Sequence, residues 1–166
     1  MSGNSRILSV VVLLLGVALV LSARAEADGV TPPERLASVG ATSATPSELA
    51  VVRVINVFRR SNGLPALRIG PALTRAARSH SVDMVRRGYF DHGPFVQRLR
   101  RFGVRAPYVG ENLASGTKPL GAGAIVQMWI ASPPHRQNLL DRGFRRIGVG
   151  LAGGGTRLVT ADFAGS

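Results

Sequence analysis

The 166-residue chain has no cysteine, and it is also poor in acids, histidines and aromatic residues. Without cysteine there is no disulfide framework, no thiol nucleophile, no zinc–thiolate site and no cysteine-linked lipoprotein anchor. A glycine-rich phosphate loop of either standard type and a G-x-S-x-G nucleophile motif are absent as well. The 3 histidines and 9 acids therefore make a short list of candidate catalytic or metal-binding side chains.

Lysine is nearly absent too, because Lys118 is the only one and every other basic residue is an arginine. The formal net charge is +12. Such an excess of positive charge is typical of proteins that meet nucleic acid, an anionic membrane or an acidic wall polymer. Charge alone does not choose among these partners.

The chain has no apolar run of the roughly 20 residues that a membrane-spanning helix needs. Its apolar run, residues 7–21, follows Arg6 and precedes the small residues around Ala23 and Ala25. This order is typical of a cleavable signal peptide, which we place at residues 1–25. We therefore expect a protein that is secreted or held in the cell envelope, that meets the membrane only through the uncleaved signal peptide, and that does not bind nucleic acid. The arginines then indicate either affinity for envelope polyanions or a solvated surface.

Residues 26–45 are rich in Pro, Gly, Ser, Thr and Ala without a sustained period, as in a flexible linker. A folded domain is expected over residues 46–164. Thr45 and Glu48 have the spacing of a capping box, and Pro46 suits the first helical position. The apolar periodicity predicts helices over residues 46–62, 71–88, 94–102 and 119–131, and a short one capped by Ser132 and ending near Leu140.

Two short strands, 147–151 and 158–163, are predicted near the end of the chain, joined by a hairpin at residues 153–155. Residues 103–118 are expected to be a loop, and no early strand is evident. Helices followed by a hairpin indicate an α+β fold in which helices cover a small antiparallel sheet. The pattern also predicts a buried Trp129, and it places Arg78 with Arg75, Arg86 and Arg87 on the outer face of the second helix.

The three histidines have different settings. His80 lies on the apolar face of the second helix, which favours a structural role. His92 follows a helix end, and His135 follows two prolines that restrict the backbone. With Glu111, between Gly110 and Leu113, these last two histidines are of the residue types that bind zinc, but no local spacing brings them together. A Ser132/His135/Glu111 triad is conceivable, although Ser132 is more simply a helix cap.

Several ordered motifs resemble those of the CAP superfamily, which comprises cysteine-rich secretory proteins, antigen 5 and pathogenesis-related proteins and is also called SCP-like. The resemblance is greatest to the bacterial branch and covers roughly residues 46–163. The motifs are His80-Ser81-x-Asp83-Met84, Tyr89-Phe90-x-His92, Gly110-Glu111-Asn112-Leu113-Ala114-x-Gly116, Trp129-Ile130-x-Ser132-Pro133-x-His135-Arg136-x-Asn138-Leu139-Leu140 and Phe144-x-x-Ile147-Gly148-Val149-Gly150.

This resemblance implies a three-layer α-β-α sandwich with a small antiparallel sheet. It also implies a cleft in which the family places two histidines and two glutamates. His92, Glu111 and His135 match three of the four, and Ser132 stands where the other glutamate is expected. The eukaryotic members' disulfides have no counterpart here.

Family members are known to bind sterols or other lipids, or a divalent metal through the two histidines, and proteolysis has been proposed for a few. We expect a monomeric, non-enzymatic binding module whose partner is a lipid, a wall polymer or a protein. The resemblance implies zinc or another divalent cation on His92 and His135. The alternative is a metal-assisted protease or wall-cleaving hydrolase that uses His92, Glu111 and His135.

Overall fold

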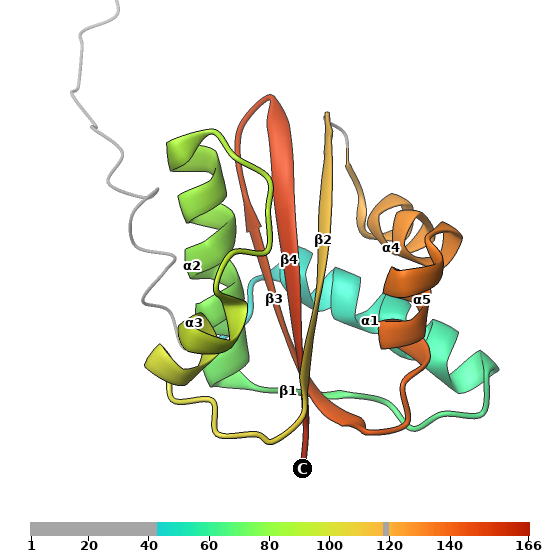
Figure 1. The fold of residues 1–166 in the computed structure, drawn as a ribbon. Helices are drawn as coiled ribbons and strands as arrows, with labels where there is room; N and C mark the ends of the chain where they lie inside the picture. The colour runs from blue at the N-terminus through green and yellow to red at the C-terminus, as the bar shows by residue number, and fades with distance from the viewer. Residues whose placement is uncertain (1–42, 118–119) are drawn as a thin grey trace, which may run out of the picture. The chain divides into compact units, whose positions relative to one another are not determined.

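A four-stranded sheet with helices on both of its faces makes up the part of the chain that the computed structural model describes, residues 43–117 and 120–166 (Figure 1). The predicted signal peptide and nearly all of the predicted linker lie outside these residues. The elements are α1 (Pro46–Ser61), β1 (Arg68–Ile69), α2 (Pro71–Arg87), α3 (Phe95–Arg101), β2 (Val109–Thr117), α4 (Ala122–Ala131), α5 (Pro133–Leu140), β3 (Phe144–Ala152) and β4 (Thr156–Gly165).

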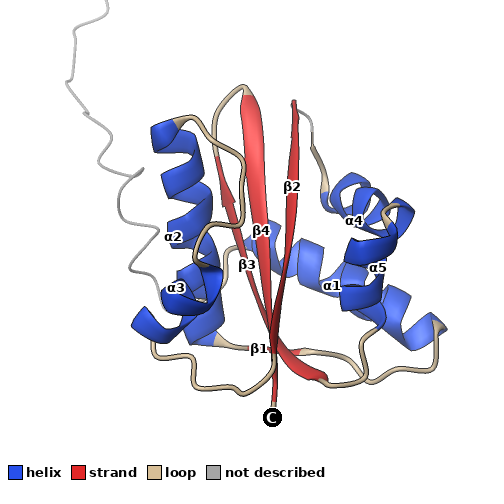
Figure 2. Ribbon diagram, viewed as in Figure 1, coloured by secondary structure: helices blue, strands red, loops and turns tan. Residues whose placement is uncertain are grey.

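The strand order in the sheet is β1-β3-β4-β2. β4 pairs antiparallel with both β2 and β3, whereas the short β1 runs parallel to β3. Helices α2 and α3 lie on one face of the sheet, and α1, α4 and α5 lie on the other (Figures 1 and 2). This arrangement confirms the predicted α+β class and the three α-β-α layers.

Strand β2 replaces most of the predicted loop over residues 103–118, and that prediction was wrong. The stretch 110–114 is buried at every position because helices cover both faces of the sheet. A strand buried on both faces shows no apolar–polar alternation, so the period-two signal is missing from the sequence. β1 was missed for a simpler reason, since it has only 2 residues.

Helix α2 lies directly against β3 because two glycines leave room for it. A Cβ on Gly148 would lie 2.1 Å from the backbone of Leu73, and one on Gly150 would lie 2.2 Å from that of Arg78. Any side chain at these positions would push the helix off the sheet. The predicted inner face of α2 is confirmed, since it buries Leu73, Ala76, Ala77, His80 and Met84.

Arg78 is buried rather than exposed, which corrects the predicted outer face of α2. Its Nε and Nη2 donate to the two carboxylate oxygens of Glu48 at 2.6 and 2.5 Å. Glu48 also accepts from the backbone N–H of Thr45 at 2.7 Å, so the predicted capping box is formed. One carboxylate therefore caps α1 and joins α1 to α2, a tertiary role that helical periodicity does not reveal.

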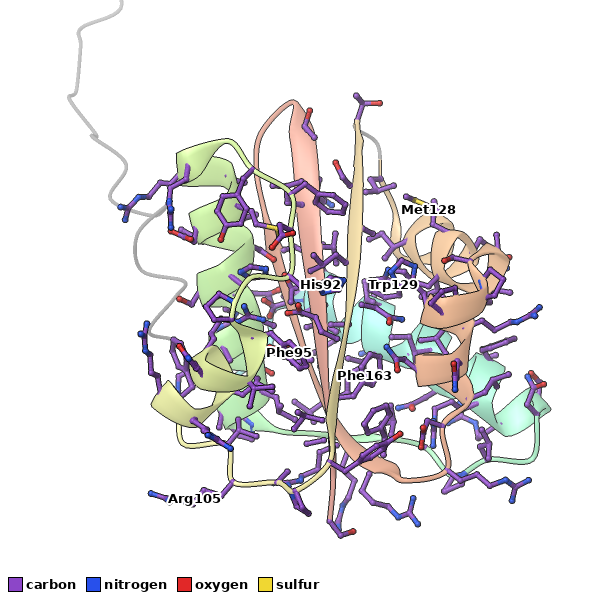
Figure 3. The ribbon with its side chains drawn as sticks, in the orientation of Figure 1. His92, Phe95, Arg105, Met128, Trp129 and Phe163 are labelled. Carbon is purple, nitrogen blue, oxygen red and sulfur yellow. The ribbon has the colours of Figure 1, made fainter. Side chains whose placement is uncertain are left out.

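The larger hydrophobic cluster lies between the sheet and α1, α4 and α5. Trp129 of α4 is 1% exposed, and its indole N–H donates to the backbone oxygen of Leu113 at 2.8 Å (Figure 3). The predicted burial of Trp129 is confirmed. α4 begins at Ala122 rather than near residue 119, and α5 spans the predicted short helix. None of the helices in residues 43–117 and 120–166 has the length and apolar character needed to cross a membrane.

Candidate functional site

His92 lies in the connection between α2 and α3, and its side chain is 51% exposed (Figure 3). Gly88 ends α2 in the left-handed conformation, with φ 66°, which turns the chain back toward the sheet. The buried ring of His80 bonds through Nε2 to the backbone oxygen of Asp91 at 2.9 Å and so holds this connection. Burial lowers the pKa of His80 to about 4, and the positive charge of Arg98 adds to the effect.

Glu111 of β2 contacts His92, and its side chain is 1% exposed. Its Oε1 is 2.7 Å from Nδ1 of His92, a distance at which the ring N–H donates to the carboxylate. Its Oε2 accepts a hydrogen bond from Nη2 of Arg98, a residue of α3. Burial raises the pKa of Glu111 to about 7 even though Arg98 opposes the shift. Both oxygens of Glu111 are therefore engaged.

A second buried carboxyl, Asp162, lies opposite Glu111 in the pairing of β2 with β4. It is fully buried, and Arg98 Nη2 approaches its Oδ1 to 3.5 Å. Neither of its oxygens has a hydrogen-bond partner of standard geometry among the described residues. Burial, together with the negative charge of Glu111, raises the pKa of Asp162 well above its usual range. We call His92, Arg98, Glu111 and Asp162 the His92 cluster.

His135 approaches from the opposite side of β2, because it belongs to α5. Its backbone oxygen accepts from the side-chain amide of Asn112 at 3.0 Å. Asn138 donates to the side-chain oxygen of Asn112 at 2.8 Å and to the backbone oxygen of Glu111 at 3.2 Å. These bonds fasten α5 to β2, which is an outer strand of the sheet. Burial lowers the pKa of His135, and the charge of His92 contributes, so the two rings interact electrostatically.

The structure thus brings His92 and Glu111 into contact and places His135 within electrostatic range of His92. Ser132 lies at the junction of α4 and α5, but its hydroxyl makes no capping hydrogen bond, contrary to expectation. Within the described part of the chain it bonds to neither His135 nor Glu111, so the Ser132/His135/Glu111 triad is not formed.

Sequence reasoning missed Arg98 and Asp162. Asp162 had a usable signal, because it is an acid inside the apolar strand 158–163. Arg98 had no such signal in the sequence, because nothing local distinguishes it from Arg100 and Arg101 on the same helix.

The donor set does not fit a metal cofactor. Three protein ligands are usual for catalytic zinc, and no group of three or more His, Asp or Glu side chains in residues 43–117 and 120–166 is arranged to hold a metal ion. The carboxylate nearest to His92 is Glu111, which is already bound by His92 and Arg98. The guanidinium of Arg98 also places a fixed positive charge beside the buried carboxyls. We therefore derive no chemical step through a metal, and metal binding by His92 and His135 stays a prediction of the resemblance.

The sequence profile of the CAP, or cysteine-rich secretory protein, family matches residues 52–163, a span that includes the whole His92 cluster and His135. The chain belongs to the CAP family. Its similarity to the Bacillus subtilis protein YkwD is 34% identity over 143 residues, which is 80% of this chain and 54% of YkwD. The chain thus spans only about half the length of that relative.

Solved structures agree with this assignment. An extracellular protein with an SCP domain from Bacillus anthracis matches with a TM-score of 0.66 at 28% identity, over 76% of this chain and 45% of that protein. An outer surface protein of Borrelia burgdorferi shares the fold, with a TM-score of 0.64 at 21% identity, over 69% of this chain and 89% of that one. The predicted CAP family and its bacterial branch are confirmed.

Proposed function

We propose that this CAP domain is a non-enzymatic binding module that acts outside the cell or in the cell envelope, and that it works without a bound metal. The observation that carries this proposal is that both carboxylate oxygens of Glu111 already have partners. Oε1 is bonded to His92, and Oε2 is bonded to Arg98. A carboxylate held in this way fixes the position of the exposed His92 ring. It is not free to activate a water molecule or to bind a metal ion itself.

The location rests on two kinds of support. The first is the signal-peptide pattern of residues 1–25. The second is the location of similar proteins, because the comparison structures from Bacillus anthracis and Borrelia burgdorferi are described as an extracellular and an outer surface protein.

One observation favours a second candidate, a hydrolase. A buried carboxylate paired with an exposed imidazole is the arrangement of a general base and the group that orients it. Glu111 would then orient His92, and His92 Nε2 would take a proton from an attacking water. The described residues supply no serine or threonine nucleophile hydrogen-bonded to His92, so this candidate requires direct attack by water.

Incubation with insoluble cell-wall material separates the two candidates. The wild-type protein is expected to sediment with the wall and to release no soluble sugar or peptide fragments above the background of a Glu111→Gln variant. A fluorescent peptide mixture is expected to stay intact under the same conditions. Fragments released by the wild type but not by Glu111→Gln or His92→Ala would establish the hydrolase instead.

A further inference from the structure

A groove of about 620 Å³ lies between α2 and α3, beside the His92 cluster. Its walls come from the last turns of α2, the following connection and α3. Four arginines line it, together with the aromatic side chains of Tyr89 and Phe102. This size is typical of binding sites for small molecules or for a segment of a chain. Arg98 belongs to both the groove and the His92 cluster, which joins the two features.

The arginines of the groove fall into two classes. Arg98 is bound to Glu111, and Arg87 is paired with Asp83 at 3.3 Å and lies over the ring of Tyr89. Arg86 of α2 and Arg101 of α3, in contrast, are exposed and make no ion pair or hydrogen bond within the described residues. Asp83 is the acid that lines the groove; it is paired with Arg87 and lies within electrostatic range of Arg86. The groove therefore has one carboxylate against four guanidinium groups, and it presents one guanidinium without a direct partner on each of its two walls.

The excess of positive charge extends over α3 and the connection that follows it. Residues 92–110 contain four arginines and no acid. A second hollow, of about 600 Å³, is lined by Arg100 and Arg105, which are also exposed and without an ion pair in the described part of the chain. Arg105 lies in the connection after α3, at the outer border of the domain (Figure 3). The arginines of α3 thus line two hollows: Arg98 and Arg101 line the α2–α3 groove, and Arg100 lines the second hollow.

Neighbouring positive charges repel one another, and a ligand with repeated negative charges removes that repulsion. Guanidinium groups bind phosphate in bidentate geometry, and they do so more specifically than ammonium groups. We propose that the α2–α3 groove binds a phosphate-bearing polymer chain, with Arg86 and Arg101 contacting phosphates from opposite walls. The adjacent Arg100 and Arg105 then contact the next phosphates along the chain. This site lies beside His92 and shares Arg98 with its cluster, but the polymer contacts proposed for it use other arginines and go beyond the proposed function.

A polymer chain fits these observations better than a membrane surface does. The groove is recessed, and the side chain of Arg98 inside it is only 11% exposed. A membrane surface attracts arginines that project from the protein, and insertion into it requires a projecting apolar patch. The large exposed apolar side chains of the described residues instead come singly from different elements or connections: Val57, Ile69, Val85, Phe90, Val96, Tyr108 and Met128. Scattered residues of this kind are normal on soluble proteins.

Binding of inorganic polyphosphate, measured by fluorescence anisotropy at several salt concentrations, tests the proposal. The wild type is expected to bind, and the double variant Arg86→Gln/Arg101→Gln is expected to bind about 10-fold more weakly. The dependence of affinity on salt should fall by about one unit of log–log slope for each phosphate that the variant no longer binds. The matched control is Arg53→Gln/Arg60→Gln, which removes the same charge from exposed positions on α1 and should change binding little.

Three outcomes would overturn the proposal. The first is no binding by the wild type, and the second is an equal loss in the control variant, which would show attraction to net charge alone. The third is binding to phosphatidylglycerol vesicles but not to polyphosphate, which would identify a membrane as the partner. Circular dichroism confirms that the variants fold, and since the wall assay for turnover does not involve Arg86 or Arg101, each proposal can fail without the other.

Discussion

At the scale of single residues, the identities of the buried polar groups decide what the site can do. Glu111 and Asp162 are two buried carboxyls that share one guanidinium, Arg98. An unpaired buried carboxylate is costly, so Arg98 and the raised carboxyl pKa values together make the pair tolerable. His92 is therefore held by Glu111 through Nδ1, while about half of its side chain stays exposed.

The sequence identified part of this arrangement. His92, Glu111 and His135 were found through matched motifs, because the spacing of the three residues carries no sign of their proximity. The sequence did not reveal the one acid, Asp162, and the one base, Arg98, that complete the cluster. Asp162 comes to lie opposite Glu111 only through the register of β2 on β4. Register between strands distant in the sequence is set by tertiary packing, and no local pattern shows it.

Replacement of Trp129 by alanine is expected to lower the free energy of unfolding by roughly 3–5 kcal/mol, because the change removes a buried indole and leaves a cavity. It also leaves the backbone oxygen of Leu113 without its donor. Chemical denaturation measures the change. The control is Met128→Ala at the neighbouring position, which is 42% exposed and should cost less than about 0.5 kcal/mol. Similar losses in the two variants would contradict the burial of Trp129.

His80 makes the folded protein less stable in mild acid. Its folded-state pKa of about 4 lies below the unfolded value of about 6.5, so the unfolded state binds the proton first. The contribution of neutral His80 is fully present above pH 6.5 and is lost as the pH falls toward 4, by about 1–3 kcal/mol. Glu111 and Asp162, with raised pKa values, act in the opposite direction over part of this range.

The contribution of His80 is therefore obtained by difference. Unfolding free energies of the wild type and His80→Gln, measured from about pH 7.5 to about pH 4, should converge as the pH falls, provided that the variant folds at neutral pH. Parallel curves would show that His80 keeps its ordinary pKa in the folded protein.

At the scale of elements, the sequence predicted the helices and the hairpin of β3 and β4, but it did not reveal β1 or β2. Capping residues, prolines and glycines mark the ends of α1 and α2 locally, so the bounds at Pro46 and Gly88 could be read from the chain. β2 consists mostly of small and polar residues, with Val109 and Leu113 as its large apolar ones, and it pairs with β4 along its whole length. Such a strand depends on its partner more than on its own propensity.

The contact of α2 with β3 gives a prediction for the motif Gly148-Val149-Gly150. Gly150→Ala is expected to destabilise the domain by about 1–3 kcal/mol or more, because the new methyl group would overlap the backbone of α2. Gly154→Ala, in the hairpin, is the matched control, since a Cβ there has no neighbour within 4 Å. Thermal unfolding compares the two. An unchanged melting temperature for Gly150→Ala would show that α2 does not lie against the sheet as described.

At the scale of the whole molecule, the excess of positive charge is the property that most restricts the choice of partner. The net charge of +12 is carried almost entirely by arginine. Some of these arginines are structural, as Arg78 and Arg98 show, and others remain exposed around α3. Fold and family followed from the sequence because the motifs run through nearly the whole domain, whereas the ligand did not, because the residues that touch a ligand leave no such pattern.

The predicted cleavage of a signal peptide concerns residues outside the described part of the chain. N-terminal sequencing of the secreted protein is expected to begin near Glu26 or Asp28, because small residues at Ala23 and Ala25 or at Ala25 and Ala27 suit the peptidase that removes signal peptides. Recovery of the protein with Met1 intact in the membrane fraction would contradict cleavage.

The central claim is that Arg98, and not a metal ion, neutralises the carboxyls of the His92 cluster, so that the domain binds its partner without metal. Thermal unfolding with and without zinc chloride tests this most directly, since any ligand selective for the folded state raises the melting temperature. The account predicts the same melting temperature for the wild type in both conditions. A rise in the wild type that is lost in His92→Ala and in His135→Ala, but kept in His80→Gln, would contradict it and establish the metal site that the family resemblance implies.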